Sequence, residues 1–110
     1  MLTSFLKWLL ASCLCVGFSH AKAAELAELL KGNDHVLLMR HALAPGLGDP
    51  AGYKLEDCKS QRNLDAQGRA QAQRIGQWLK SQGVREATVF SSAWCRCKET
   101  AEKLGLGAPV

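Results

Sequence analysis

The chain has 110 residues and a formal net charge of +4, from 14 lysine and arginine residues against 10 acidic ones. This balance is mild, and neither a basic run nor interleaved aromatic and basic residues accompany it, so we expect no nucleic-acid partner. The length allows one small domain and is short for an α/β domain.

The first 23 residues have the three-part layout of a secretory signal. A charged start ends at Lys7, the 11-residue apolar run "WLLASCLCVGF" follows, and "SHAKA" closes the segment with small residues. This layout predicts cleavage after Ala23 and export to the periplasm or the medium. The apolar run is shorter than the ~20 residues of a membrane span. A lipoprotein alternative stays open because Leu10–Cys13 resembles a lipid-attachment box, although only residues 8 to 12 would then form the apolar core.

Removal of this segment would leave residues 24 to 110, which carry a charge of +2 after the loss of two lysines. Three of the five cysteines would remain, namely Cys58, Cys95 and Cys97. Disulfides persist in an exported protein. Because the number of cysteines is odd, we expect at most one internal bridge, with one thiol free or intermolecular.

The remaining chain predicts the order helix, strand, long loop, helix, strand, helix. Apolar residues at helical spacing in "AAELAELLKGND" predict a short helix that stops at Gly32. The continuous apolar run from 36 to 39 predicts a strand that is buried on both faces. Residues 41 to 61 contain three glycines and two prolines without a period, which is typical of a functional loop.

A second helix is predicted from Asp65, a credible N-cap, to Gly83. Its expected core stripe comprises Leu64, Ala72, Ile75, Trp78 and Leu79. A second strand follows from about Ala87 to Ser91, and a third helix in "AWCRCKETAEKLG" stops at Gly105.

The strand–helix–strand order predicts an α/β fold with a parallel sheet, joined by a right-handed crossover. Ligands of such sheets bind at the carboxyl edge of the strands. Arg40 and His41 leave the first strand at this edge, and Ser91, Ser92 and Arg96 follow the second strand. Two arginines and a helix N-terminus that converge there predict an anion site. A histidine beside a bound phosphoryl group could attack its phosphorus through a ring nitrogen.

Three segments occur in the order "LLMRHA", "RNLDAQGRAQAQRIGQWL" and "FSSAWCRCKETA". They resemble the Arg-His signature, the Leu-x-x-x-Gly-x-x-Gln-Ala helix and the Ser-Ser-x-x-x-Arg-x-x-x-Thr-Ala segment of the histidine phosphatase superfamily, also called the phosphoglycerate-mutase-like fold. The three together cover nearly all of the chain after the signal. The cysteine spacing and "DCKSQRNL" resemble a small exported bacterial branch.

This resemblance implies a three-layer α/β fold with a parallel sheet, and hydrolysis of small phosphomonoesters through a phosphohistidine without a cofactor. Carried over by position, His41 would be the nucleophile, and Arg40 and Arg96 would clamp the phosphate. Arg62 would have a weaker phosphate or substrate role. The resemblance leaves the identity of the substrate and the oligomeric state open.

Members of the family continue for several further elements, which supply an acid for the leaving group and a second histidine. After Arg96 this chain has two acids, Glu99 and Glu102, on one helix, and no histidine. His35 begins the first strand, at the edge opposite His41. We therefore interpret the chain after the signal as the N-terminal part of a phosphatase domain, truncated after the second strand–helix unit and impaired in turnover. The alternative is a non-catalytic phosphate-binding or interaction module, a pseudo-phosphatase.

The three remaining cysteines allow a disulfide or a metal site. Residues two apart on a helix point to different sides, so only one of Cys95 and Cys97 can face the loop that carries Cys58. We expect Cys58 to pair with Cys95, which would staple the loop before Arg62 to the helix that carries Arg96. A three-thiolate metal site is the alternative, but export favours oxidation and no nearby histidine completes the site, so we expect no metal.

Overall fold

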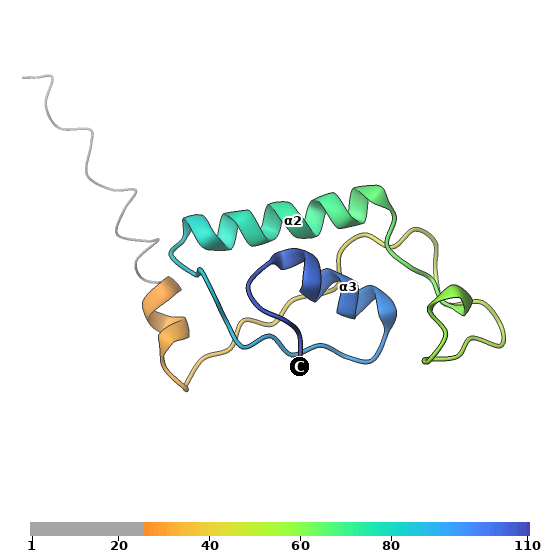
Figure 1. The fold of residues 1–110 in the computed structure, drawn as a ribbon, viewed down its shortest axis with the longest axis horizontal. Coiled ribbons are helices and arrows are strands. Elements are labelled where there is room, and N and C mark those ends of the chain that lie inside the picture. Colours follow the sequence, from red (N-terminus) through yellow and green to blue (C-terminus); the bar gives the residue numbers. More distant parts are fainter. Residues whose placement is uncertain (1–25) are drawn as a thin grey trace, which may run out of the picture.

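The computed structural model describes residues 26 to 110, which contain three helices and a short 3-10 turn (Figure 1). Residues 26 to 31 are helical, η1 spans Cys58–Ser60, α2 spans Ala66–Ser81 and α3 spans Cys95–Leu104. Within this range no helix is long and apolar enough to cross a membrane. The predicted signal, its cleavage site and the lipid-attachment box lie outside the described residues.

Helix α2 confirms the second predicted helix, and local chemistry sets both of its ends. The Asp65 side chain accepts a hydrogen bond of 2.8 Å from the N–H of Gly68, as an N-cap does. At the other end Gly83 follows the C-cap residue with φ +88°, a conformation that favours glycine. The third predicted helix is confirmed in the same way, because Gly105 ends α3 with φ +67°.

Helix α2 buries a stripe of small residues that brings other backbone into direct contact. The buried positions of this helix are Gly68, Ala72, Gly76 and Leu79. A methyl group on Gly76 would lie 1.9 Å from the carbonyl oxygen of Leu104 in α3. On Gly68 it would lie 2.0 Å from the carbonyl oxygen of Leu43. Both positions therefore require glycine, and the two contacts fix α3 and the start of the long loop against α2.

The expected core role of Trp78 is wrong, because this side chain is 55% exposed. A helix turns by about 100° per residue, so Trp78 lies about 200° around the axis from Gly76 and faces away from α3. Leu79 is only 1% exposed and packs instead with Val84, Leu104 and Leu106. Helical spacing alone could not distinguish the two neighbouring residues.

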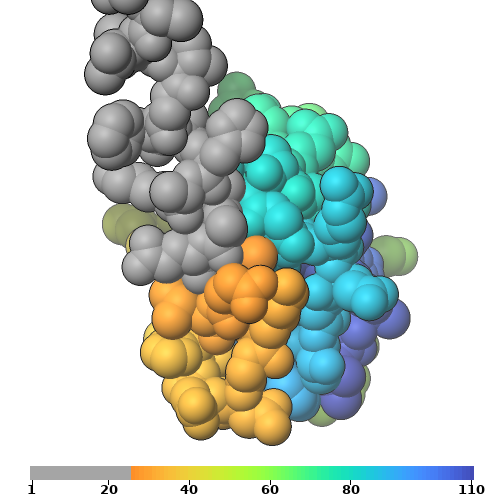
Figure 2. All heavy atoms as spheres, turned by 90° about the vertical axis from the view of Figure 1, so that its left-hand side faces the viewer, coloured from red at the N-terminus to blue at the C-terminus, as the bar shows by residue number. Residues whose placement is uncertain are grey.

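The predicted α/β fold, a three-layer arrangement around a parallel sheet, is wrong. Between residues 26 and 110 no strand forms, and the β-structure consists of two isolated bridges, Lys54 with Asp57 and Val89 with Pro109. Residues 35 to 41 and 86 to 92 run side by side in the same direction (Figures 1 and 2). A groove separates them, and no backbone hydrogen bond joins one to the other.

The two segments do not form a sheet because strand pairing requires a spacing of about 4.8 Å, and because two strands alone rarely form a stable sheet. Segment 86 to 92 instead pairs on one side with the end of the chain. Ala87 N–H donates to the Leu106 carbonyl, and Val110 N–H donates to the Val89 carbonyl. The predicted burial of the first strand is wrong as well, since Val36 and Leu38 are 89% and 93% exposed.

We predict that Gly76→Ala destabilises the protein by about 1–3 kcal/mol, the usual effect of overpacking a tight contact. In an exposed helix the same change stabilises by roughly 1 kcal/mol, so the sign of the effect reports the clash with Leu104. Urea unfolding followed by circular dichroism measures it. The control is Gly32→Ala, where the nearest other atom lies 4.0 Å from the added carbon. Equal stability of Gly76→Ala and wild type would contradict the packing described here.

Candidate functional site

A groove of about 850 Å³ lies between the two unpaired segments. Arg40 and His41 line it from the end of the first segment, and Ser91 and Ser92 line it from the end of the second. Because the segments run in the same direction, the two pairs come from corresponding ends (Figure 1). The structure thus places along one groove four of the five residues that the sequence placed at one sheet edge, although no sheet forms; the fifth, Arg96, does not line it.

The ring of His41 is half-buried and contacts the backbone of the next residue. Its Nδ1 lies 2.7 Å from the carbonyl oxygen of Ala42. A carbonyl oxygen can only accept, so Nδ1 carries the proton in the neutral ring. The lone pair therefore resides on Nε2, which is the nitrogen available to a ligand.

The chain that follows His41 is anchored to both long helices. Ala42 is buried, and its N–H donates to Oγ1 of Thr100 in α3 at 3.0 Å. The Thr100 hydroxyl in turn donates to the carbonyl oxygen of Arg96 at 2.7 Å. Leu43 N–H donates to the Gln71 side chain of α2 at 2.8 Å. The position of His41 is thus tied to the first turns of α3 through one threonine.

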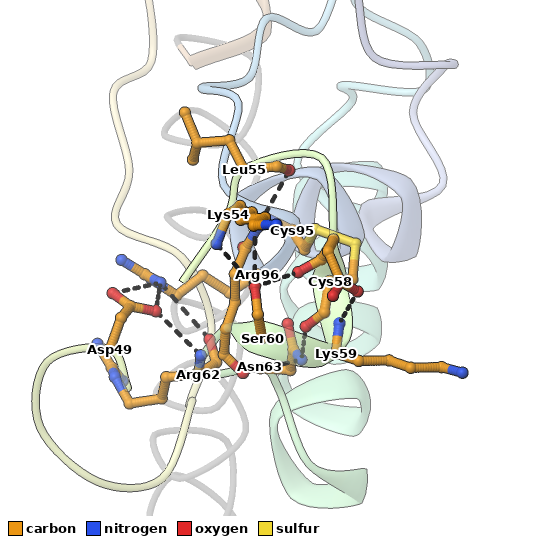
Figure 3. The surroundings of a disulfide bond; sticks show 12 residues. Asp49, Lys54, Leu55, Cys58, Lys59, Ser60, Arg62, Asn63, Cys95 and Arg96 are labelled. Carbon is orange, nitrogen blue, oxygen red and sulfur yellow. Dashed lines mark hydrogen bonds and ion pairs between the residues drawn. A yellow bond between two sulfur atoms is a disulfide. The ribbon is translucent and has the colours of Figure 1, made fainter. Parts of the chain in front are cut away.

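Arg62 and Arg96 meet at a carboxylate that the sequence analysis did not select (Figure 3). Asp49 accepts hydrogen bonds from the N–H of Arg62 at 2.9 Å and from Nη1 of Arg96 at 3.0 Å. The Arg62 guanidinium donates to the carbonyls of Gly48, at 2.7 Å, and Ala44, at 2.5 Å. Neither arginine lines the groove of His41. The predicted site therefore falls into two neighbouring groups.

Charge and hydrogen bonding at this point favour the ionised form of Asp49. Its side chain is 10% exposed and that of Arg96 is 11% exposed. The hydrogen bond from the Arg62 backbone, followed by the charge and hydrogen bond of Arg96, holds the pKa of Asp49 below its ordinary value of 3.8. Burial opposes this effect without reversing it.

A disulfide between Cys58 and Cys95 ties the long loop to the first residue of α3. This is the pairing expected from the sequence, and Cys97 is free. The bridge uses two of the three thiols that the alternative metal site would need. Gln61 adds a second link, because its Oε1 accepts from the N–H of Cys95 at 2.9 Å.

The start of α3 offers fewer free donors than a bare helix N-terminus. Trp94 is the N-cap residue and forms no side-chain cap, so the buried Gln61 supplies one from the loop. The N–H of Cys97 bonds to the Trp94 carbonyl at 2.9 Å. In this first turn, the N–H of Arg96 has no partner among the described residues. We expected several free N–H groups at this helix start to contribute to an anion site. Among the described residues, the N–H of Arg96 is the one that remains free in the first turn.

Sequence reasoning missed Asp49 and Gln61 because each forms its hydrogen bond to α3 with a residue far away in the sequence. Asp49 bonds to Arg96 47 positions later, and Gln61 to Cys95 34 positions later. The small-residue stripe of α2 had a visible signal, since Gly68, Ala72 and Gly76 repeat every four residues. That spacing places them on one face of a helix.

Residues 36–110 match the family model of the histidine phosphatase superfamily (branch 1). The chain belongs to this superfamily. Comparison with curated proteins and comparison with solved structures each found no match. Membership indicates a phosphatase-type function and a small phosphorylated substrate. The matched range includes both groups of site residues, from Arg40 to Arg96.

We predict that loss of the Cys58–Cys95 bridge destabilises the protein by about 2–4 kcal/mol. The bridge spans a sequence separation of 37, and without it the unfolded chain gains loop entropy. The double variant Cys58→Ser/Cys95→Ser and the reduced wild type should show the same loss in urea unfolding. Cys97→Ser, which removes the free thiol, is the control and should behave like wild type. A reduced wild type that is as stable as the oxidised protein would refute this role.

We also predict a pH-dependent contribution of Asp49 to stability. Because its folded pKa is lowered, the contribution is complete above the unfolded pKa of about 3.9 and is lost as the pH falls through the folded pKa. The stability difference between wild type and Asp49→Asn should therefore be constant from pH 7 to pH 5 and shrink below pH 4. Urea unfolding at these pH values measures it. A difference that stays unchanged down to pH 2 would argue against the interaction.

Proposed function

We propose that the chain accepts the phosphoryl group of a small phosphomonoester on Nε2 of His41. The observation that carries this proposal is the contact of Nδ1 with the Ala42 carbonyl, which leaves the Nε2 lone pair free. Arg40 and Arg96 would bind the phosphoryl oxygens, and Arg62 would have the weaker role. Family membership supports the reaction class.

The step forms one bond and breaks one. The Nε2 lone pair attacks phosphorus, a P–N bond forms, and the ester P–O bond breaks with its electron pair on the leaving oxygen. The proton of the Nδ1–H tautomer stays on the ring and is shared with the Ala42 carbonyl. Water then attacks the phosphohistidine, the P–N bond breaks, inorganic phosphate leaves and the neutral ring returns.

A phosphate-binding module without turnover is the second candidate. The scarcity of acidic side chains around the groove favours it, because a phosphatase needs an acid to protonate the leaving group. In the part of the chain that the structure describes, Glu86 is the one acid that lines the groove, and it begins the segment that ends in Ser91 and Ser92. An alkyl leaving group would therefore take its proton from solvent, which makes its departure slow. We expect phosphoryl transfer from aryl esters, whose leaving oxygen departs as a stable anion, and little from alkyl esters.

Export to the periplasm or the medium is part of this proposal. The Cys58–Cys95 disulfide is compatible with an oxidising compartment. The signal layout of the first 23 residues supports the same location.

We predict that p-nitrophenyl phosphate labels His41 and releases a burst of about one equivalent of nitrophenolate, as for a covalent intermediate. Mass spectrometry at neutral pH locates the label, and NMR distinguishes Nε2 from Nδ1 as the phosphorylated atom. His41→Ala should abolish the burst and the label. His35→Ala removes the other described histidine, at the far end of the same segment, and should retain both.

The outcomes separate the two candidate functions. Inorganic phosphate that binds to wild type without any label from the aryl ester would leave the binding module as the function. A label that survives in His41→Ala would exclude His41 as the acceptor.

A further inference from the structure

The guanidinium of Arg96 is bonded through one of its nitrogens and has a second, buried nitrogen without a partner among the described residues. Its Nη1 donates to both carboxylate oxygens of Asp49, at 3.0 and 3.3 Å, and lies 3.5 Å from the Arg62 carbonyl. Its Nε is buried and has no hydrogen-bond partner among the described residues. The ring of Trp94 stacks on the guanidinium, with its centroid 4.4 Å from Cζ.

The geometry of a guanidinium restricts what Arg96 can still bind. The group has five N–H donors in one plane, and these form two forks, one from Nη1 and Nη2 and one from Nε and Nη2. Because Asp49 occupies Nη1, the fork that remains is the one that contains Nε. A fork of this kind matches two oxygens of a phosphoryl group.

We infer that Asp49 is a positioning residue, which fixes the rotation of the Arg96 guanidinium so that its Nε–Nη2 fork receives the phosphoryl oxygens. This inference rests on the proposed function, since the phosphoryl group is the ligand. The buried Nε supports it, because a buried donor without an acceptor is unfavourable and a phosphoryl oxygen would satisfy it. Trp94 restricts the guanidinium plane from its face, and Asp49 restricts rotation within that plane.

Asp49 is itself held in place by groups other than Arg96. Its Oδ1 accepts from the N–H of Arg62, and Pro50 follows it in the chain. The Cys58–Cys95 bridge and the Gln61 cap join the same loop to the start of α3. Two arginines and one carboxylate leave a net positive charge at this point, so an anion is still attracted. A carboxylate that merely filled the anion site would instead compete with phosphate, and the two roles predict effects of opposite sign.

The test titrates inorganic phosphate into wild type, Asp49→Ala and Asp49→Asn, with the Nε–H signal of Arg96 followed by NMR and assigned with Arg96→Lys. Loss of one charge-assisted hydrogen bond corresponds to a loss of about tenfold or more in affinity. We expect that loss in Asp49→Ala, and a smaller one in Asp49→Asn, whose amide oxygen still accepts from Nη1. In wild type, phosphate should shift the Nε–H signal. Glu56→Gln makes the same change of charge in the same loop and should bind phosphate like wild type.

The outcomes distinguish this inference from the proposed function. Phosphate binding that is tighter in Asp49→Ala than in wild type, or unchanged, would overturn the positioning role and leave the anion site intact. If wild type binds no phosphate at all, both proposals fail. Should Asp49→Ala prove unfolded by circular dichroism, Asp49→Asn decides: a weaker affinity supports the inference, and an Nε–H shift and affinity equal to wild type overturn it.

Discussion

Two places where backbone packs directly against α2 determine how the rest of the chain is arranged. The carbonyl of Leu104 lies against Gly76, and the carbonyl of Leu43 lies against Gly68, so any side chain at either glycine would separate the partners. The first contact fixes the end of α3, and the second fixes the segment that leaves His41. Both α3, which carries the proposed phosphate ligand Arg96, and the proposed nucleophile His41 are therefore positioned from one face of one helix.

The long loop is attached to this framework by three different kinds of interaction. A covalent bridge joins Cys58 to Cys95, the buried Gln61 caps the start of α3, and Asp49 joins the two arginines. These links bring residues separated by more than thirty positions together at the N-terminus of α3. The surface ion pair between Arg69 and Glu99 is longer, at 3.5 Å, than the ion pair between Arg96 and Asp49, at 3.0 Å, and it is more exposed. It therefore contributes little to stability.

The groove of this member of the histidine phosphatase superfamily combines two features. Arg40, His41, Ser91 and Ser92 line it, and they include the proposed phosphoryl acceptor. Along its length the backbone of residues 35 to 41 is unpaired, and Val36 and Leu38 are almost fully exposed. Among the described residues that line the groove, Glu86 is the one acid, and it begins the segment that ends in Ser91 and Ser92, so the groove offers several groups to a phosphoryl oxygen and one acid to a leaving group. This contrast is the physical basis for expecting transfer from aryl esters before turnover of alkyl esters.

The sequence by itself determined the features that depend on neighbouring residues. Asp65, Gly83 and Gly105 mark helix ends because caps and left-handed turns act within a few positions. Helical periodicity also showed that only one of Cys95 and Cys97 could reach Cys58, and the structure shows that it is Cys95. Tertiary structure alone decided the rest. Strand pairing failed because it requires a partner at the right distance, which a run of apolar residues does not supply. Trp78 is exposed because Gly76 set which face of α2 meets α3. Asp49 became the centre of the arginine pair because folding brought together charges that lie 13 and 47 positions apart.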